Sequence, residues 1–207
     1  MMRTSVDSQE SDQTLSQEGP QGPIRKPIAI TMGDPAGIGP EIILRALARA
    51  PETGLEGPFV VYGCPGWMEA VARRLGLNTG LLEVVPVTEM PEDLPVGQVS
   101  AAGGEAAFQA VYRAAQDAMA GKVRAVVTAP LSKAAMNLAG HVYPGHTEIL
   151  AEVGGNVPVR MMLANEELRT VLVSIHVPLG VAVSSLSTAG IVETIRLTDA
   201  FLRMTGI

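Results

Sequence analysis

Short apolar runs alternate along most of the chain with longer segments in which apolar residues recur at helical spacing. Strands are predicted at four Val-, Ile- and Ala-rich runs, over 26–32, 59–63, 83–87 and 123–129. Helices are predicted over 41–50, 67–75, 104–121, 130–140 and 188–205, and most of them end at or before a glycine. Strands that alternate with helices in this way are typical of an α/β protein with a largely parallel sheet.

The second half of the chain contains a different pattern. Two apolar runs, 158–164 and 168–176, flank the polar residues 165–167, which predicts an antiparallel hairpin. At the other end, residues 1–24 are rich in Ser, Gln, Glu and Gly and have almost no apolar content, so they are expected to be a disordered tail. We therefore expect one ordered region, 25–207.

Composition and charge exclude several classes of protein. The net charge is −6 and basic residues form no stripe, which argues against a nucleic-acid partner. The single cysteine, Cys64, excludes an intrachain disulfide and is interpreted as a small buried side chain. No apolar run is long enough for a membrane span or a secretory signal, so the protein is expected to be soluble and cytoplasmic.

A glycine-rich turn joins the first predicted strand to the first helix. Its sequence, Gly33-Asp-Pro-Ala-Gly-Ile-Gly-Pro40, has neither dinucleotide-binding nor Walker A spacing. The pattern favours a tight turn in which glycines permit close packing, rather than an anion-binding loop. Asp34 is the one residue of this turn that is suited to chemistry.

Other candidate residues lie near the starts of two short helices. Lys133 falls in the first turn of the 130–140 helix, for which Ser132 is the candidate cap. A cation there opposes the helix dipole, so it is either a solvated lysine or a ligand of a phosphate or carboxylate. His146 and Thr147 begin the next helix, where they either bind an anion or form an ordinary start capped by Thr147.

Histidines mark both ends of the segment 145–176, and we expect these two ends to meet at a site. His176 is predicted to end the second hairpin strand just before Pro178, a fixed position that suits a metal ligand but is also common for structural histidines. His141, the third histidine, is interpreted as a surface residue of a turn.

Taken together, five motifs resemble the 4-hydroxythreonine-4-phosphate dehydrogenases of pyridoxal phosphate biosynthesis. They are residues 31–41 (TMGDPAGIGPE), 128–133 (TAPLSK), 145–148 (GHTE), 161–169 (MMLANEELR) and 176–179 (HVPL). The resemblance implies a three-layer fold like that of the isocitrate and isopropylmalate dehydrogenases. It also implies a homodimer with active sites at the subunit interface.

The resemblance assigns roles to four residues. His146 and Thr147 bind substrate, His176 is a ligand of a divalent metal (Zn, Mg or Co), and Lys133 lies near the substrate as a candidate catalytic residue. The implied reaction is the oxidation of 4-phosphooxy-L-threonine by NAD (or NADP), followed by decarboxylation to 3-amino-2-oxopropyl phosphate. The residues that contact the cofactor are not assigned.

The resemblance covers the N-terminal part of the family, somewhat under two-thirds of it. An Asn-Pro-His segment and a later His-Asp segment, which supply further metal ligands in the family, do not occur here. The sequence is thus expected to be C-terminally truncated, and this chain alone is expected not to turn over. The alternatives are a dehydrogenase of another phosphorylated hydroxy acid, such as a four-carbon sugar-acid 4-phosphate, a non-catalytic module that binds a phosphorylated ligand, or a misfolded fragment.

Overall fold

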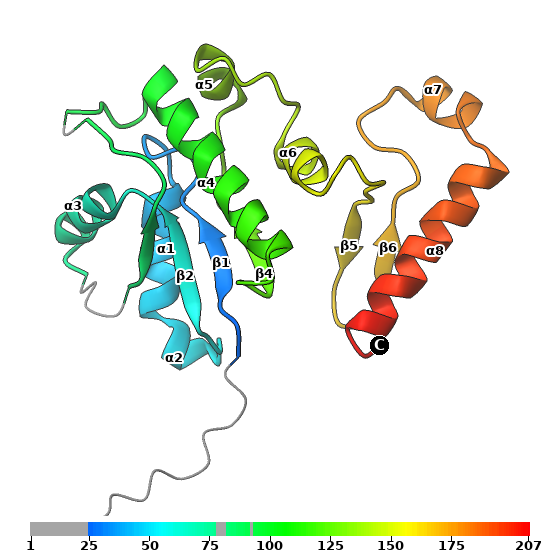
Figure 1. Cartoon of the computed structure of the whole chain (residues 1–207), viewed down its shortest axis with the longest axis horizontal. Coiled ribbons are helices and arrows are strands. Elements are labelled where there is room, and N and C mark those ends of the chain that lie inside the picture. Colours follow the sequence, from blue (N-terminus) through cyan, green and yellow to red (C-terminus); the bar gives the residue numbers. More distant parts are fainter. Residues whose placement is uncertain (1–24, 78–81, 92) are drawn as a thin grey trace, which may run out of the picture.

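A computed structural model describes residues 25–77, 82–91 and 93–207, and the tail predicted over 1–24 lies outside this part (Figure 1). The strands are β1 (Ile28–Thr31), β2 (Phe59–Gly63), β3 (Val84–Pro86), β4 (Ala125–Thr128), β5 (Met162–Ala164) and β6 (Arg169–Val171). The helices are α1 (Gly39–Ala48), α2 (Ala50–Thr53), α3 (Pro65–Leu75), α4 (Ala101–Met119), α5 (Lys133–Leu138), α6 (His146–Val153), α7 (Leu179–Ser184) and α8 (Thr188–Met204). The expected α/β class is confirmed.

Four strands form a parallel sheet in the order β3-β2-β1-β4. In this register Ile30 lies between Val61 of β2 and Val127 of β4. The chain adds β2 and β3 on one side of β1 and then crosses back through α4 to add β4 on the other side. This reversal creates a topological switch point between β1 and β4, where open α/β sheets bind their ligands.

Helices cover both faces of the sheet, so the expected three layers are present (Figure 1). Ala29, Val60 and Tyr62 pack with residues of α4 on one face. Met32 and Val61 pack with residues of α1 and α3 on the other face. Because successive strand residues point to opposite faces, both faces of these strands are apolar, as a parallel sheet between two helical layers requires.

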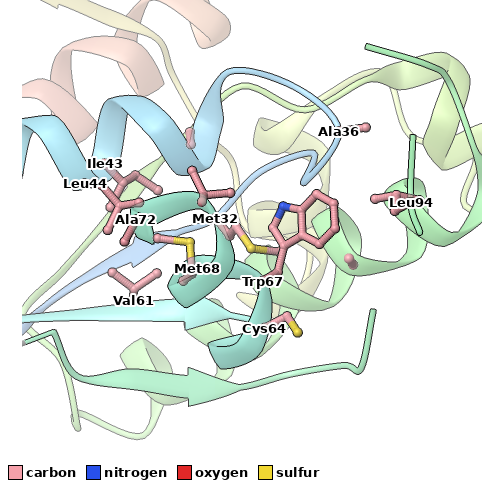
Figure 2. Packing of buried hydrophobic residues seen from close by; sticks show 13 residues of the cluster. Met32, Ala36, Ile43, Leu44, Val61, Cys64, Trp67, Met68, Ala72 and Leu94 are labelled. Atoms are coloured by element: carbon pink, nitrogen blue, oxygen red, sulfur yellow. The ribbon is translucent and has the colours of Figure 1, made fainter. Parts of the chain in front are cut away.

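The core on the α1 and α3 side is built around one tryptophan, because the chain has few aromatic residues (Figure 2). Trp67 is 7% exposed, and its indole Nε1–H donates to the carbonyl oxygen of Pro35 at 2.9 Å. Met32 and Met68 fill the space beside it. Cys64 is buried in the same cluster, as the sequence predicts. The tryptophan thereby ties α3 to the glycine-rich turn after β1.

Several element boundaries differ from the sequence prediction. Helix α4 begins three residues earlier than expected, because the side chain of Ser100 accepts a hydrogen bond from the N–H of Gly103 and caps it. The hairpin strands β5 and β6 contain three residues each rather than the predicted seven and nine. Helix α7 was not predicted. The start of α8 after Ser187, whose side chain accepts from the N–H of Gly190, is confirmed.

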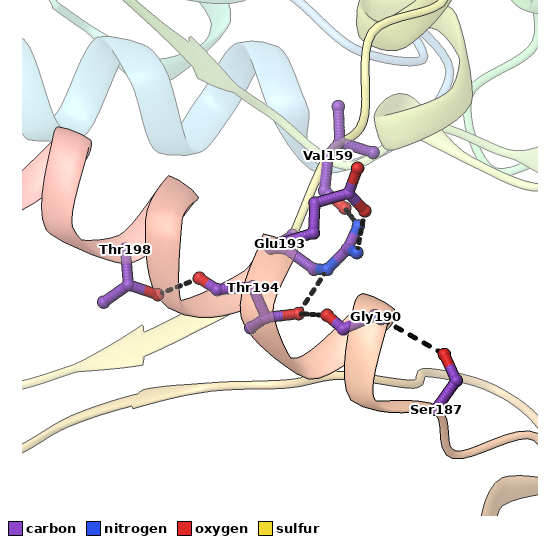
Figure 3. A network of polar contacts seen from close by, with 7 residues as sticks. Val159, Ser187, Gly190, Glu193, Thr194 and Thr198 are labelled. Atoms are coloured by element: carbon purple, nitrogen blue, oxygen red, sulfur yellow. Dashed lines mark hydrogen bonds and ion pairs between the residues drawn. The ribbon is translucent and has the colours of Figure 1, made fainter.

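The hairpin, α7 and α8 form an arm, residues 158–207, that lies beside the layered part (Figure 1). Arg160 joins the start of the arm to Glu193 and Thr194 of α8, two residues labelled in Figure 3. Its Nε–H donates to Thr194 Oγ1 at 2.8 Å, and its guanidinium also pairs with Glu193. Thr194 is buried, whereas many apolar side chains of α8 and the hairpin are exposed, including Leu163, Ile195 and Met204. None of the helices in the described part is both long enough and apolar enough to cross a bilayer.

Candidate functional site

The candidate site lies at the switch point, where the segments that follow β1 and β4 meet. Gly33 has φ +71°, and a Cβ added there would lie 2.3 Å from the carbonyl oxygen of Pro130. The N–H of Asp34 donates to the same oxygen at 3.0 Å. These contacts lock the turn after β1 against the segment after β4, and only glycine fits at position 33.

The glycines of this turn permit close packing, as the sequence analysis favoured. A Cβ at Gly39 would lie 2.2 Å from the carbonyl oxygen of Met32, so the turn folds back tightly on its own strand. The space beside these glycines is therefore filled by protein backbone rather than open to a ligand. Gly33 and Gly39 therefore serve the packing of the turn against its neighbours.

Asp34 is the acidic group of the site, and it is 8% exposed. Its Oδ1 accepts a hydrogen bond from the N–H of Ala36 at 2.9 Å. A Cβ on Gly103, in the first turn of α4, would lie 2.8 Å from the same oxygen. Burial raises the pKa of the Asp34 carboxyl, and the Ala36 N–H partly offsets that rise. The structure thus places a buried carboxyl beside the N-terminal turn of the longest helix.

His146 is the first residue of α6 and is half-buried. Its Nε2 lies 3.2 Å from the carbonyl oxygen of Ala129, the residue that directly follows β4. Because a carbonyl can only accept, Nε2 carries the proton, and in the neutral ring Nδ1 holds the lone pair. Burial lowers the pKa of His146, and the bond to Ala129 opposes this only in part. A neutral imidazole with a fixed tautomer can accept a proton from a hydroxyl group.

Two expectations for the neighbouring helices have opposite outcomes. Ser132 caps α5 by accepting from the N–H of Ala135 at 3.2 Å, as predicted. Thr147 does not cap α6. The helix begins at His146, Gly145 occupies the capping position, and no side chain bonds to the first turn as a cap. Thr147 is half-buried next to His146, and Lys133 is exposed as the first residue of α5.

His176 does not end a strand, so that prediction is wrong. Strand β6 stops at Val171, and His176 lies exposed in a bend before α7, with a left-handed φ of +57°. Among the described residues, β6 pairs with β5 at three positions that end at Val171, and the backbone bends before it reaches His176. His146 contacts Ala129 while His176 belongs to the arm, and the hydrogen bonds of the described part do not join them.

The described residues do not fit a metal centre by themselves. No group of three or more His, Cys, Asp or Glu side chains converges anywhere in the part of the chain that the structure describes. A protein-bound divalent metal at a catalytic site usually has about three protein ligands. His176 can supply one ligand at most.

Sequence reasoning missed a contact made by the third histidine. His141 is not a simple surface residue, because its side chain is 22% exposed and its Nε2 lies 2.6 Å from Glu105 Oε2. Its ring also stacks on Phe108, with ring centroids 3.6 Å apart. Glu105 and Phe108 lie three residues apart on one face of the predicted helix, but nothing in the sequence pairs that face with His141.

The fold and the site define a doubly wound α/β protein with a buried carboxyl and a neutral histidine at the switch point of its sheet. The profile of the family described as pyridoxal phosphate biosynthetic protein PdxA matches residues 43–207. The chain belongs to this family. The resemblance noted from the sequence motifs is thereby confirmed.

Two curated relatives are equally similar to this chain but differ in name. D-threonate 4-phosphate dehydrogenase from Salmonella typhimurium is 41% identical, over 87% of this chain and 60% of the relative. 4-Hydroxythreonine-4-phosphate dehydrogenase from Beijerinckia indica is also 41% identical, over 87% of this chain and 57% of the relative. The crystal structure of a 4-hydroxythreonine-4-phosphate dehydrogenase from Burkholderia phymatum matches with a TM-score of 0.81 and 34% identity, over 89% of this chain and 60% of that one. The chain therefore spans about 60% of the length of these relatives, which are dehydrogenases.

Proposed function

We propose that this chain carries the substrate-binding part of a dehydrogenase that oxidises 4-phosphooxy-L-threonine with NAD (or NADP) and a divalent metal. In this reaction the carbinol carbon loses hydride to the nicotinamide and the hydroxyl group loses a proton. The resulting β-keto acid then releases carbon dioxide and leaves 3-amino-2-oxopropyl phosphate. We propose that the protein acts in the cytoplasm.

The observation that carries this proposal is the state of His146. Its Nε2 is occupied by the Ala129 carbonyl, so the ring presents Nδ1 as a hydrogen-bond acceptor. Burial lowers the pKa of His146, which keeps the ring neutral near pH 7. An acceptor of this kind binds and orients a substrate hydroxyl group and can assist removal of its proton.

Two neighbouring residues complete the proposed substrate contacts. The Thr147 hydroxyl is not used as a helix cap and is therefore available to a polar group of the substrate. Lys133 is an exposed cation beside the segment that follows β4, and its charge suits the phosphate or the carboxylate of the substrate. We propose the ligand interpretation of Lys133, and its exposed position is compatible with it.

The metal and the nicotinamide cofactor have weaker support within this chain. A bound divalent metal would supply Lewis-acid stabilisation of the developing oxyanion. We assign His176 to it as a single ligand on the family resemblance, and the described residues form no complete set around it. The nicotinamide cofactor would supply the hydride acceptor.

A second substrate has equal support from the relatives. The Salmonella typhimurium relative is named for D-threonate 4-phosphate and the Beijerinckia indica relative for 4-hydroxythreonine 4-phosphate, at the same 41% identity. The two substrates differ in whether an amino or a hydroxyl group is carried beside the carboxylate. Both therefore belong in the test.

Binding is the first test. The purified chain is titrated by calorimetry with each of the two phosphorylated acids, and we expect one of them to bind. His146→Gln should weaken that binding about tenfold, since one buried hydrogen bond is worth about 1.4 kcal/mol. Arg49→Ala, an exposed charge at the C-terminal end of α1, serves as the control and should bind normally. Absence of binding by either acid would contradict the proposal.

Turnover is the second test. We expect no NADH from this chain alone. A chimera that joins residues 1–207 to the remaining portion of the Beijerinckia indica relative should form NADH with the acid that binds, and lose activity with His146→Gln. A folded chimera that binds the acid without oxidising it would favour the non-catalytic binding module instead.

The arm provides the proposed dimer contact. Leu163, Ile195 and Met204 are 60%, 61% and 78% exposed, a concentration of apolar surface that is unusual for a free monomer. We propose that a homodimer forms through this arm, with the active sites at the interface. Ile195→Glu should convert a dimer to a monomer in sedimentation equilibrium, whereas Ile38→Glu, at an exposed position outside the arm, should not.

A further inference from the structure

The connection between α5 and α6, residues 139–145, leads directly into His146 and contains no helix or strand. His141 lies within it. The backbone N–H of His141 donates to the carbonyl oxygen of Met136, which continues the end of α5. The position of the remaining connection therefore depends on its side-chain contacts.

His141 makes two of those contacts with α4. Its Nε2 lies 2.6 Å from Glu105 Oε2 on α4, and its ring stacks nearly parallel on Phe108, with planes 12° apart. Phe108 is 7% exposed and belongs to a small core cluster with Met136 of α5 and Ile149 of α6. One side chain of the connection is thus bound to a buried part of α4 by both a polar and an aromatic contact.

The charged and titratable groups around His141 come from α4, from α6 and from the connection itself. Glu105 Oε1 accepts from the amide of Gln109 at 2.8 Å. The rings of Tyr112 and Tyr143 also stack with Phe108, and Tyr143 donates to Glu152 at 2.8 Å. Burial alone would raise the pKa of Glu105, but the hydrogen bonds from Gln109 and His141 outweigh it and leave the pKa lowered. Glu105 is therefore ionised at neutral pH and accepts from both partners.

Glu105 also belongs to the end of α4 that borders the candidate site. It is two residues beyond Gly103, whose Cα lies against Asp34. The next residue after Gly103, Gly104, is so close to α5 that a Cβ would lie 2.0 Å from the carbonyl oxygen of Ala135. The start of α4 is thus a rigid reference point, and a residue bound to it is fixed relative to the site.

We propose that Glu105 and His141, with Phe108 beneath the imidazole, form a latch that positions His146 against the Ala129 carbonyl. His146 itself is held by one hydrogen bond of 3.2 Å. Four residues lie between it and His141, so loss of the His141 contacts loosens the connection that leads into α6. Glu105 and His141 are positioning residues in this arrangement. The placement of His146 is independent of the proposed function, and only the role of His146 toward a substrate rests on that function.

The test uses the imidazoles themselves, because the chain has three histidines. Their ring nitrogen signals are assigned by single substitution and titrated by NMR. In His141→Ala, the pKa of His146 should rise toward the ordinary value as burial is lost. Glu105→Gln, which keeps the shape of the side chain, should give a smaller rise in the same direction. Tyr143→Phe, which breaks the neighbouring bond to Glu152, is the control and should leave His146 unchanged.

A merely structural role would lower the melting temperature without moving the His146 titration in the folded protein. Unchanged His146 signals in folded His141→Ala or in Glu105→Gln would therefore overturn the latch, as would an equal shift in Tyr143→Phe. Glu105→Gln keeps the test decisive if His141→Ala does not fold. A binding titration separates the two proposals: if His146→Gln leaves substrate affinity unchanged, the proposed function fails while the NMR result still tests the latch.

Discussion

The phenol of Tyr62 on β2 donates a 2.9 Å hydrogen bond to Asp117 Oδ2 near the end of α4, between residues that are both buried. Asp117 also accepts from Lys122 at 2.8 Å and from Arg113 at 3.3 Å. The phenol is thus one of three donors to a single carboxylate. Burial and this bond together raise the pKa of Tyr62 to about 12.

This relationship predicts unequal effects for its two partners. Tyr62→Phe leaves Asp117 with its two basic donors and should lower the free energy of unfolding by about 1 kcal/mol. Asp117→Ala leaves a buried phenol without an acceptor and should lower it by about 3 kcal/mol. Urea denaturation at pH 7 measures both values. Equal losses would contradict the added cost of leaving the buried phenol without an acceptor.

Asp117 also predicts how stability depends on acid. The hydrogen bond from Lys122 is the largest influence and lowers the pKa of Asp117 in the folded state. The ionised Asp117 carboxylate therefore contributes its full stabilisation above the pKa of the unfolded chain, about 3.9. This contribution is lost as the pH falls through the lower pKa of the folded state. Asp117→Asn should flatten the loss of stability below pH 4. Acid titration of the circular dichroism signal of both proteins tests this.

His146 changes stability in the same direction but at higher pH, because burial lowers its pKa in the folded state. The unfolded chain binds more protons at this residue once the pH falls below about 6.5, so the folded state loses stability there. His146→Gln should remove that part of the slope. Urea midpoints at pH 7.5 and pH 5.5 compare the variant with the parent chain. A parallel loss in both proteins would contradict the neutral state assigned to this ring.

Gly104 predicts a large effect of a single methyl group. A Cβ there would lie 2.0 Å from the backbone oxygen of Ala135, so Gly104→Ala must separate α4 from α5 and should cost about 3 kcal/mol. Gly66 provides a matched control in α3, because a Cβ added at that position would point into open space. Gly66→Ala should be neutral or stabilising by about 0.5 kcal/mol. Thermal unfolding of the two variants distinguishes them.

Arg160 and Thr194 predict a local effect in the arm (Figure 3). Thr194→Val removes the acceptor of the 2.8 Å bond from Arg160 and should destabilise α8 by about 1 kcal/mol. Thr198 bonds only to the backbone oxygen of Thr194 on its own helix, so Thr198→Val is the control and should have a smaller effect. Hydrogen exchange of the α8 amides is the measurement. Faster exchange in both variants alike would show that Arg160 does not anchor the helix.

Local patterns predicted much of this molecule correctly. The cap at Ser132, the buried Cys64 and the packing role of the glycines after β1 all depend on neighbours within a few residues or on strand periodicity. Contacts between distant segments were not accessible in this way. The His141 contact with Glu105 joins residues 36 positions apart, and nothing near His141 indicates it.

The errors at Thr147 and His176 have a related cause. A threonine after a Gly-His pair has the composition of a cap, but the extended backbone at Gly145 starts α6 one residue earlier. The apolar run before His176 is long enough for a strand, but pairing requires a partner, and β5 provides three residues. The sequence pattern thus indicates which element a segment can form, whereas the segments that pack against it determine how many of its residues take part.

Strand β4 is an edge of the parallel sheet, because within the described residues it pairs with β1 on one side alone. Val127 in its middle is 51% exposed. The outer edge of such a strand offers unpaired backbone donors and acceptors to any strand that approaches it. The solubility of this chain at high concentration therefore depends on what covers β4, and an added strand there would enlarge the sheet without altering its hydrophobic layers.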